Sequence, residues 1–274
     1  MSPETTPLHR AKTGADRFAT APPLDELRGS YRVRFARSEE DVRRCCSMRY
    51  EVFNLELGEG LAGSETLELD QDPYDGVCHH LMVLEERTGE VVGTYRMQTW
   101  EVAMAGHGFY SADEYDLSGI PEAVLRQSVE LGRAAIVREH RDKSVLYLLW
   151  RGLTAYRLWT GTRHMFGCSS LTSQDPEEGL RCHDYLRRKG YLHPEFEALP
   201  LPGYVCEVAD HTPFTGEYPI PKLFSFYLRY GAKLCSPPAL DRHFGTIDFL
   251  TWMDTNSIMG KLTEAFSKGL ARPR

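Results

Sequence analysis

The sequence lacks the features that would place the protein in a membrane or an oxidising compartment. Across its 274 residues, no apolar run approaches the roughly 20 residues that a membrane-spanning helix needs. The first 29 residues are polar and rich in Pro, Ala and Thr, without the apolar core of a signal peptide. We therefore predict that residues 1–29 form a flexible leader and that the protein is cytoplasmic.

The cysteine pattern argues against disulfide bonds and against a bound metal. The seven cysteines are an odd number and include no C-x-x-C pair. Cytosolic thiols normally stay reduced, and a buried free cysteine packs like a small apolar residue. A zinc site built from Cys78, His79 and His80 with Cys182 and His183 would lack the usual ligand spacing. We predict mostly buried thiols and no metal site.

The charge balance excludes a general nucleic-acid binder. With 32 basic and 39 acidic residues the formal net charge is −7, whereas nucleic-acid binders carry a strongly basic face. We predict one domain over residues 30–254 and a C-terminal amphipathic helix or tail over residues 255–274. Ile258, Leu262 and Phe266 recur every four residues in this tail, which favours a packed helix. Its four basic residues and one acidic residue (net +3) leave a membrane-surface helix, and hence a peripheral position on the inner membrane, as the alternative.

Alternating and helical apolar patterns predict a mixed α/β fold. A helix begins at the N-cap candidate Ser38, and a central strand occupies the first half of Val129–Trp150. The other predicted strands cover residues 31–36, 79–86, 91–99, 164–171, 204–208, 232–235 and 246–253, and the other helices cover 144–160, 176–189 and 221–230.

The central strand carries two charged residues that a regular pleat would separate. Glu130 and Arg133 are three positions apart and would point to opposite faces. Gly132 lies between them, and a glycine inside a strand often marks a bulge. We predict a bulge at Gly132 that turns both side chains toward one cleft and leaves nearby amides unpaired.

The helix over residues 144–160 is apolar nearly all round and should be buried. Ser144 is its predicted N-cap, and Arg141 and Lys143 add positive charge beside the helix N-terminus. Such a terminus favours an anion such as a phosphate. Two solvated loop cations are the alternative interpretation.

Two further groups of charges are open to more than one interpretation. Arg49 and Phe53 lie on one helical face, either as functional contacts or as a surface arginine over a core phenylalanine. Arg96 lies inside a predicted strand and needs a partner or a ligand. A loop dense in acid is either solvated or a site for a cation or amine. Its acids are Glu65, Glu68, Asp70, Asp72 and Asp75.

Several motifs resemble those of known acyltransferases. The segments Arg49-Tyr-Glu-Val-Phe53, Asp72-Pro-Tyr-Asp75, Gly93-Thr-Tyr-Arg96 and Glu130-Leu-Gly-Arg133 resemble the set shared by acyl-homoserine-lactone synthases and N-acyl amino acid synthases. The segments at 108–118, 148–153, 166–171 and 231–250 look most like ornithine-lipid N-acyltransferases. The resemblance covers about residues 31–254. It implies the GNAT fold, a mixed and mostly antiparallel central sheet flanked by helices, with splayed central strands.

The resemblance also implies an activity. It points to transfer of a long-chain, 3-hydroxylated or plain acyl group from acyl carrier protein to the α-amino group of ornithine, giving lyso-ornithine lipid. The donor is an acyl-phosphopantetheine thioester, or an acyl-CoA, and no cofactor stays bound. Glycine, lysine, glutamine or a homoserine-type amine are alternative acceptors. A non-catalytic module that binds acyl carrier or membrane is the alternative of another class.

The residues carry over to named roles. The implied substrate contacts are Arg49, Phe53, Asp72, Asp75 and Arg96, and the implied catalytic pair is Glu130 and Arg133. We expect Glu130 to act as the base for the amine, directly or through a water, with a structural ion pair to Arg133 as the alternative. Amides at the Gly132 bulge would stabilise the oxyanion, without an acyl-enzyme. The phosphopantetheine and the acidic carrier would meet Arg138, Arg141, Lys143 and Ser144, with Arg151 in the same basic patch.

Overall fold

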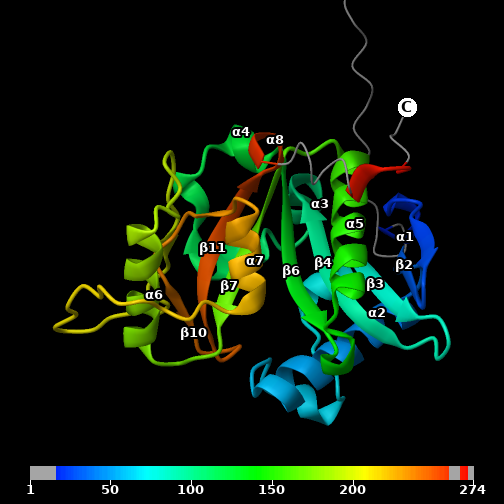
Figure 1. Cartoon of the computed structure of the whole chain (residues 1–274), viewed down its shortest axis with the longest axis horizontal. Helices are drawn as coiled ribbons and strands as arrows, with labels where there is room; N and C mark the ends of the chain where they lie inside the picture. The colour runs from blue at the N-terminus through cyan, green and yellow to red at the C-terminus, as the bar shows by residue number, and fades with distance from the viewer. Residues whose placement is uncertain (1–16, 259–265, 271–274) are drawn as a thin grey trace, which may run out of the picture.

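One large mixed sheet organises the chain in the computed structural model, which describes residues 17–258 and 266–270. Its strand order is β1-β2-β3-β4-β6-β7-β11-β10, and β9 also pairs with β11. The pairs are antiparallel except β6 with β7, which run parallel. The predicted mixed, mostly antiparallel sheet is confirmed (Figure 1).

The element bounds follow the apolar patterns closely in the centre of the chain. The strands are β1 (Asp25–Arg28), β2 (Tyr31–Phe35), β3 (His79–Glu85), β4 (Val91–Thr99), β5 (Tyr115–Asp116), β6 (Ser128–Ile136), β7 (His164–Leu171), β8 (Leu199–Pro200), β9 (Lys233–Leu234), β10 (Ala239–Asp241) and β11 (Thr246–Asp254). The α-helices are α1 (Arg17–Thr20), α2 (Glu39–Tyr50), α3 (Trp100–Ala105), α4 (Glu122–Leu125), α5 (Lys143–Thr160), α6 (Pro176–Arg188), α7 (Lys222–Arg229) and α8 (Thr255–Ile258). The π-helix η2 (Glu51–Leu57) continues α2, and short 3-10 turns are η3 (Ser64–Thr66), η4 (Pro73–Gly76), η5 (Tyr110–Asp113), η6 (Leu117–Gly119) and η7 (Arg138–His140).

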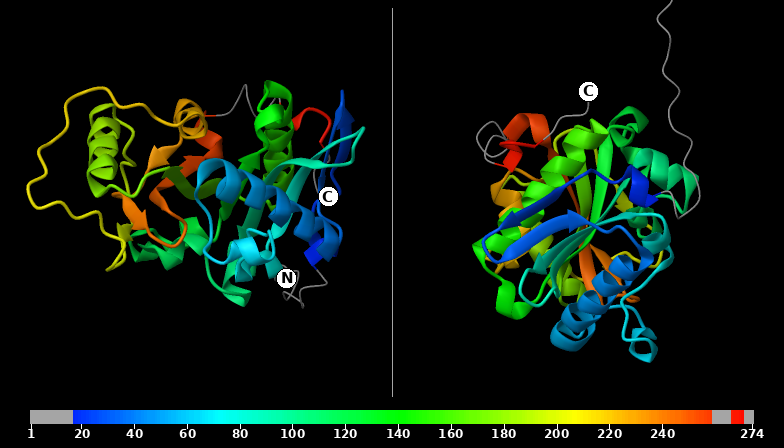
Figure 2. Two further views of the ribbon diagram at one scale, coloured as in Figure 1. Left: turned by 90° about the horizontal axis from the view of Figure 1, so that it is seen from below. Right: turned by 90° about the vertical axis from the view of Figure 1, so that its right-hand side faces the viewer.

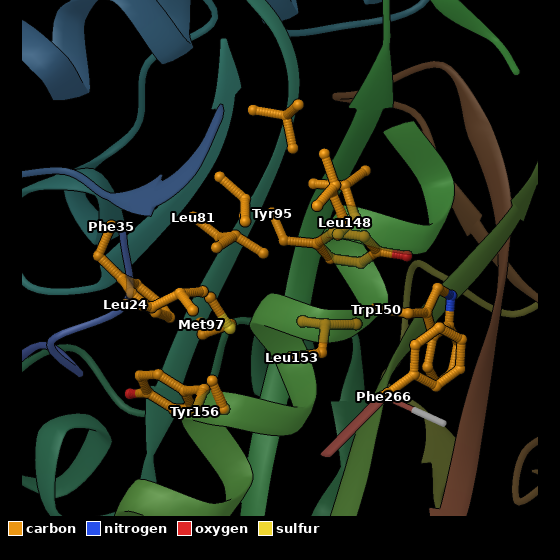
Figure 3. Packing of buried hydrophobic residues seen from close by; sticks show 14 of the residues in the cluster. Leu24, Phe35, Leu81, Tyr95, Met97, Leu148, Trp150, Leu153, Tyr156 and Phe266 are labelled. Atoms are coloured by element: carbon orange, nitrogen blue, oxygen red, sulfur yellow. The ribbon is translucent and has the colours of Figure 1, made fainter. Parts of the chain in front are cut away.

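Helices α2 and α5 cover opposite faces of the sheet. Along β3 the side chains alternate, so Leu81 joins the core under α5 while Met82 joins the core under α2. Leu148 and Leu153 of α5 and Tyr95 of β4 share the first of these cores (Figure 3). Ten residues of α5 are buried, so the prediction of a largely buried apolar helix is confirmed.

The parallel pair β6–β7 separates after a short contact. The strands pair only between Ser128–Glu130 and His164–Phe166, and they then diverge (Figure 1). At Gly167, a side-chain Cβ would overlap the carbonyl oxygen of Leu131. Glycine therefore allows the two strands to pass closely where they begin to part. The predicted splay of the central strands is confirmed.

The N-terminal prediction needs correction. Residues 17–28 were assigned to a flexible leader, but Arg17–Thr20 form α1 and Asp25–Arg28 form β1, which pairs with β2 at the sheet edge (Figure 2). Leu24 is buried in the core just before β1. This edge strand is mostly exposed and lacks an apolar alternation, so its sequence resembles a loop. Residues 1–16 lie outside the described part of the chain.

The C-terminal segment packs on α5 as far as it is described. Helix α8 covers Thr255–Ile258, and Leu262 of the predicted tail helix lies outside the described residues. Phe266 is buried against Trp150, with ring centroids 6.1 Å apart. Arg151 is buried as well and donates hydrogen bonds to the carbonyl oxygens of residues 266 and 268. The prediction that Arg151 belongs to an exposed carrier-binding patch is therefore wrong. Among the described helices, none combines the length and apolarity needed to cross a bilayer.

Candidate active site

Three arginines from three elements meet three aspartates from one loop in the interior. The arginines are Arg49 of α2, Arg96 of β4 and Arg133 of β6, and the aspartates are Asp70, Asp72 and Asp75. The six side chains are at most 9% exposed. Their formal charges cancel, which is what burial of so many ionised groups requires.

Asp75 is the centre of this network. Arg49 donates from Nη1 and Nη2 to the two oxygens of Asp75 over 2.9 and 2.8 Å, and its Nε lies 2.8 Å from Asp70 Oδ1. Arg96 donates to Asp72 over 2.5 Å and to Asp75 over 3.1 Å. Burial opposes ionisation of Asp75, but the charges of Arg49 and Arg96 outweigh it and hold the pKa of Asp75 well below its usual range.

Arg133 completes the network from the central strand. It donates to Asp70 over 3.2 Å and to Asp72 over 3.0 Å, and its guanidinium lies over the rings of Tyr110 and Phe244 at 4.9 and 4.4 Å. All three aspartates are thus bound by the protein's own arginines. The hypothesis that this part of the loop is solvated is therefore wrong, whereas its role as an amine site stays a prediction. The idea of a surface Arg49 is wrong too, because that side chain is fully buried.

The predicted bulge exists, one residue further along the strand. Arg96 pairs with Gly132 and Thr94 pairs with Ala135, so two residues of β6 oppose one residue of β4. Arg133, rather than Gly132, takes the left-handed backbone conformation, with φ of 49°. This conformation is costly for a residue with a side chain, and the contacts of the guanidinium hold it in place. Glu130 and Arg133 consequently line the same pocket.

Glu130 is buried and fully hydrogen-bonded. Its Oε2 accepts from Gln98 Nε2 over 2.6 Å and from the Tyr110 amide over 2.8 Å. Its Oε1 accepts from the Ser111 amide and hydroxyl over 2.8 and 2.6 Å. The four bonds fix the carboxylate and tie η5 to the central strand. Within the described residues the partners of Arg133 are Asp70 and Asp72, so the alternative ion pair between Arg133 and Glu130 is not formed.

A pocket of about 710 Å³ occupies the space between the diverging strands. Its wall is largely apolar, and polar groups are few, as in many small-molecule sites. The apolar lining includes Phe53, Leu131, Leu149, Phe226 and Phe244. The polar lining includes Arg96, Glu130, Arg133, Cys168, Ser169 and Asp248. Of the predicted substrate contacts, Phe53 and Arg96 reach the pocket, whereas Arg49, Asp72 and Asp75 are absent from its lining and serve the arginine network.

The N-terminus of α5 differs from the prediction. The N-cap is Asp142, not Ser144, and its carboxylate accepts hydrogen bonds from the amides of Ser144 and Val145 over 2.7 and 3.0 Å. An acidic cap already satisfies these amides, so the expected open anion site on them is not present. Ser144 is exposed beside Lys143.

The remaining predicted carrier contacts are on the surface near this cap. Arg141 lines the pocket and donates two hydrogen bonds to Glu56, over 2.6 and 2.8 Å. Arg138 forms a longer ion pair with Glu56, 3.2 Å apart. Arg138, Arg141 and Lys143 are all exposed. The structure therefore places them together, as the sequence suggested, although Glu56 neutralises part of their charge.

Two buried carboxyl groups were missed by the sequence analysis. Glu114, after η5, and Asp248, in β11, are 2% and 4% exposed. Both lie in segments that resemble ornithine-lipid N-acyltransferases, residues 108–118 and 231–250, but neither was among the predicted site residues. An aspartate in the middle of the apolar strand Ile247-Asp-Phe-Leu250 was the available signal.

Several known acyltransferases are similar to this chain in sequence. A family model described as an acetyltransferase (GNAT) domain matches residues 48–151. The solved AHL synthase LasI aligns with 90% of this chain and 100% of its own, at a TM-score of 0.49 and 13% identity. The L-ornithine N(alpha)-acyltransferase of Agrobacterium fabrum strain C58 is 33% identical over 246 residues, which cover 85% of this chain and 84% of that protein. The protein of the same name from Rhizobium meliloti strain 1021 is 30% identical over 275 residues, covering 93% and 92%. At this identity and coverage, the chain belongs to the L-ornithine N(alpha)-acyltransferase family and is an acyltransferase with a GNAT-type fold.

Proposed function

We propose that the protein transfers a long-chain, 3-hydroxylated or plain acyl group from the thioester of acyl carrier protein to the α-amino group of ornithine, giving lyso-ornithine lipid. The observation that carries this proposal is the pocket of about 710 Å³, which is apolar enough for an acyl chain and polar beside Glu130 and Arg133. The names of the relatives support ornithine as the acceptor.

The open edge of β6 supports a pantetheine donor. Among the strands that the structure describes, β6 pairs only with β4 beyond Glu130, and its other edge faces the pocket rather than β7. Extended ligands with amide groups bind to such an edge by adding to the sheet. In the proposal the phosphopantetheine arm enters past Arg141, and the exposed cations Arg138 and Lys143 meet the acidic carrier. The arm is a substrate, and no cofactor remains bound.

The polar side chains of the pocket suit direct aminolysis of the thioester. In this reaction Arg133 binds the acceptor's α-carboxylate, and Glu130 takes the proton of the attacking amine through a water. The new C–N bond forms as the C–S bond breaks, and the proton passes to the departing thiolate. Burial and the carboxylates of Glu114 and Asp248 raise the pKa of the Cys168 thiol well above its usual value, so this thiol is a poor nucleophile for an acyl-enzyme.

An amphiphilic product also supports peripheral contact with the inner membrane. Leu55 and Leu67 are 67% and 66% exposed, and the nearby Leu57 lines the pocket. We propose that Leu55 and Leu67 enter the lipid surface when the product leaves. Co-sedimentation with anionic vesicles tests this, with the Leu55→Gln, Leu67→Gln double variant as the comparison. Equal sedimentation of both proteins would remove the proposal.

The first test of function is a product assay. Purified protein is incubated with 3-hydroxypalmitoyl carrier protein, or the corresponding CoA ester, and a panel of amino acids, and products are read by mass spectrometry. We expect N-acylated ornithine from the carrier thioester. Glu130→Gln should lower kcat by about 10²- to 10⁴-fold with an unchanged circular dichroism spectrum. Glu90→Gln, at an exposed site, is the matched control. Acylation of another amine would change the acceptor, and no product from folded protein would reject the function.

A further inference from the structure

Two buried carboxyl groups beside the pocket form no ion pair with any residue in the described part of the chain. An oxygen of Glu114, an oxygen of Asp248 and the Cys168 sulfur all lie within 4.8 Å of one another. Both Glu114 oxygens and Asp248 Oδ1 accept no hydrogen bond from any residue that the structure describes. In the same interior, Asp70 and Asp75 are each bound by arginine. The pair therefore stands apart from the charges that hold the fold together.

Leaving such groups unpaired is unfavourable for the folded protein. Burial, followed by the charge of Asp248, raises the pKa of Glu114 well above its usual value. Burial also raises the pKa of Asp248, to about 6. Asp241 faces the pair, but its own carboxylate is occupied by the amides of residues 243 and 244. Two carboxyl groups this close rarely ionise together, so we expect them to share one proton and to carry about one negative charge at neutral pH.

The pair is reachable from the substrate side. Asp248 lines the pocket together with Glu130, Arg133 and Cys168, and a Glu114 oxygen lies within 4.8 Å of an Asp248 oxygen. A ligand that brings one positive charge to Asp248 would complete the pairing that the protein leaves open. Arg133 lines the same pocket and its charge favours ionisation of Glu114, but its guanidinium is held by Asp70 and Asp72. The positive charge that pairs with Asp248 would therefore come from a molecule that binds in the pocket.

We propose that Asp248, supported by Glu114, binds the side-chain ammonium of the acceptor amino acid and so selects acceptors that carry a terminal amine. This inference rests on the proposed function, in which the acceptor occupies this pocket. Arg133 would then bind the α-carboxylate, Glu130 would face the α-amine, and Asp248 would distinguish ornithine from an apolar amino acid of the same length. Binding of an amine, which the sequence suggested for the acidic loop, is thereby assigned to Glu114 and Asp248.

The decisive experiment measures binding separately from chemistry. Ornithine and norvaline, which has the same carbon skeleton without the terminal amine, are titrated into the intact protein by calorimetry. Wild type should bind ornithine more tightly, and Asp248→Asn should lower the ratio of the two affinities by about 10- to 100-fold. Glu114→Gln is the second variant, should Asp248→Asn fail to fold. Asp210→Asn, at an exposed position, is the matched control and should leave the ratio unchanged.

The outcomes separate the inference from the proposed function. An unchanged ratio in folded Asp248→Asn, or an equal loss of both ligands, would overturn the inference even if ornithine is acylated. A ratio that falls as expected supports it even if the product assay identifies another donor or product. A metal site is the competing explanation, because Glu114, Cys168 and Asp248 could also hold an ion. Stoichiometric binding of Zn²⁺ to these residues, together with loss of ornithine affinity in EDTA, would overturn the inference.

Discussion

Replacement of Arg49 by Met tests the arginine–aspartate network directly. Arg49 is fully buried and is the bidentate partner of Asp75, and its Nε also pairs with Asp70. Methionine retains an unbranched apolar stem but removes the charge, so the six balanced charges become a buried net charge of −1. Breaking a buried ion pair in this way costs about 3–5 kcal/mol, a large fraction of the 5–15 kcal/mol by which a typical protein is stable.

The assay is urea unfolding followed by circular dichroism at pH 7.5. Arg32→Met is the control, because Arg32 also pairs with two acids, Asp25 and Glu86, but is solvent-accessible (35% exposed), so its loss should destabilise the protein far less than the loss of Arg49. The double variant Arg49→Met, Asp75→Asn restores neutrality and should lose less than the sum of its single variants. A loss below about 1 kcal/mol for Arg49→Met, or equal losses in Arg49→Met and Arg32→Met, would refute the reasoning.

Three other predictions concern pH, the carrier and the splayed strands. Burial lowers the pKa of His79 to about 4, so the stability that neutral His79 supports is present above pH 6.5 and is lost as the pH falls toward 4. As the pH is lowered from 7.5 to 5, the free energy of unfolding of His79→Gln, measured in urea, should rise by about 2 kcal/mol relative to that of wild type. A difference that does not change with pH would contradict this. Arg138→Glu with Lys143→Glu should raise KM for the carrier thioester but leave KM for the amino acid unchanged, and an unchanged carrier KM would discard the docking patch. Gly167→Ala should lower the free energy of unfolding by about 1–3 kcal/mol, because its methyl group would overlap a β6 carbonyl oxygen, and a neutral effect would show that β6 and β7 can move apart freely.

The elements that could be predicted from sequence are those with strong local signals. The buried helix was expected over residues 144–160 and runs over Lys143–Thr160, and the following strand has the predicted bounds His164–Leu171. Both have long apolar patterns that end at glycine or polar residues. Gly132 signalled the bulge in β6, but the strained residue is Arg133, because tertiary contacts decide which residue takes the left-handed conformation.

The pairing of charges could not be read from local patterns. Arg49 and Asp75 are 26 residues apart, and nothing in either segment specifies that they meet. The N-cap of α5 is Asp142, two residues before the predicted Ser144, because the Asp142 carboxylate accepts hydrogen bonds from the amides of Ser144 and Val145 and so starts the helix earlier. The exposed strand β1 depends on pairing with β2 and carries little apolar signal of its own.

The buried charges of this interior fall into two groups with different consequences. Asp70, Asp72 and Asp75 are each paired with arginine, so they position β6 and its bulge, and Arg133 is a member of this network that also lines the pocket. Asp248 and Glu114 are buried to a similar degree but form no ion pair with any residue that the structure describes, which lowers stability unless a cation from the pocket completes the pairing. An acidic loop that looks like an amine site in the sequence can therefore be framework, while a single aspartate in an apolar strand carries the selectivity. Substitutions in the network should therefore mainly lower the free energy of unfolding, whereas substitutions at Asp248 should mainly change the selectivity between acceptors.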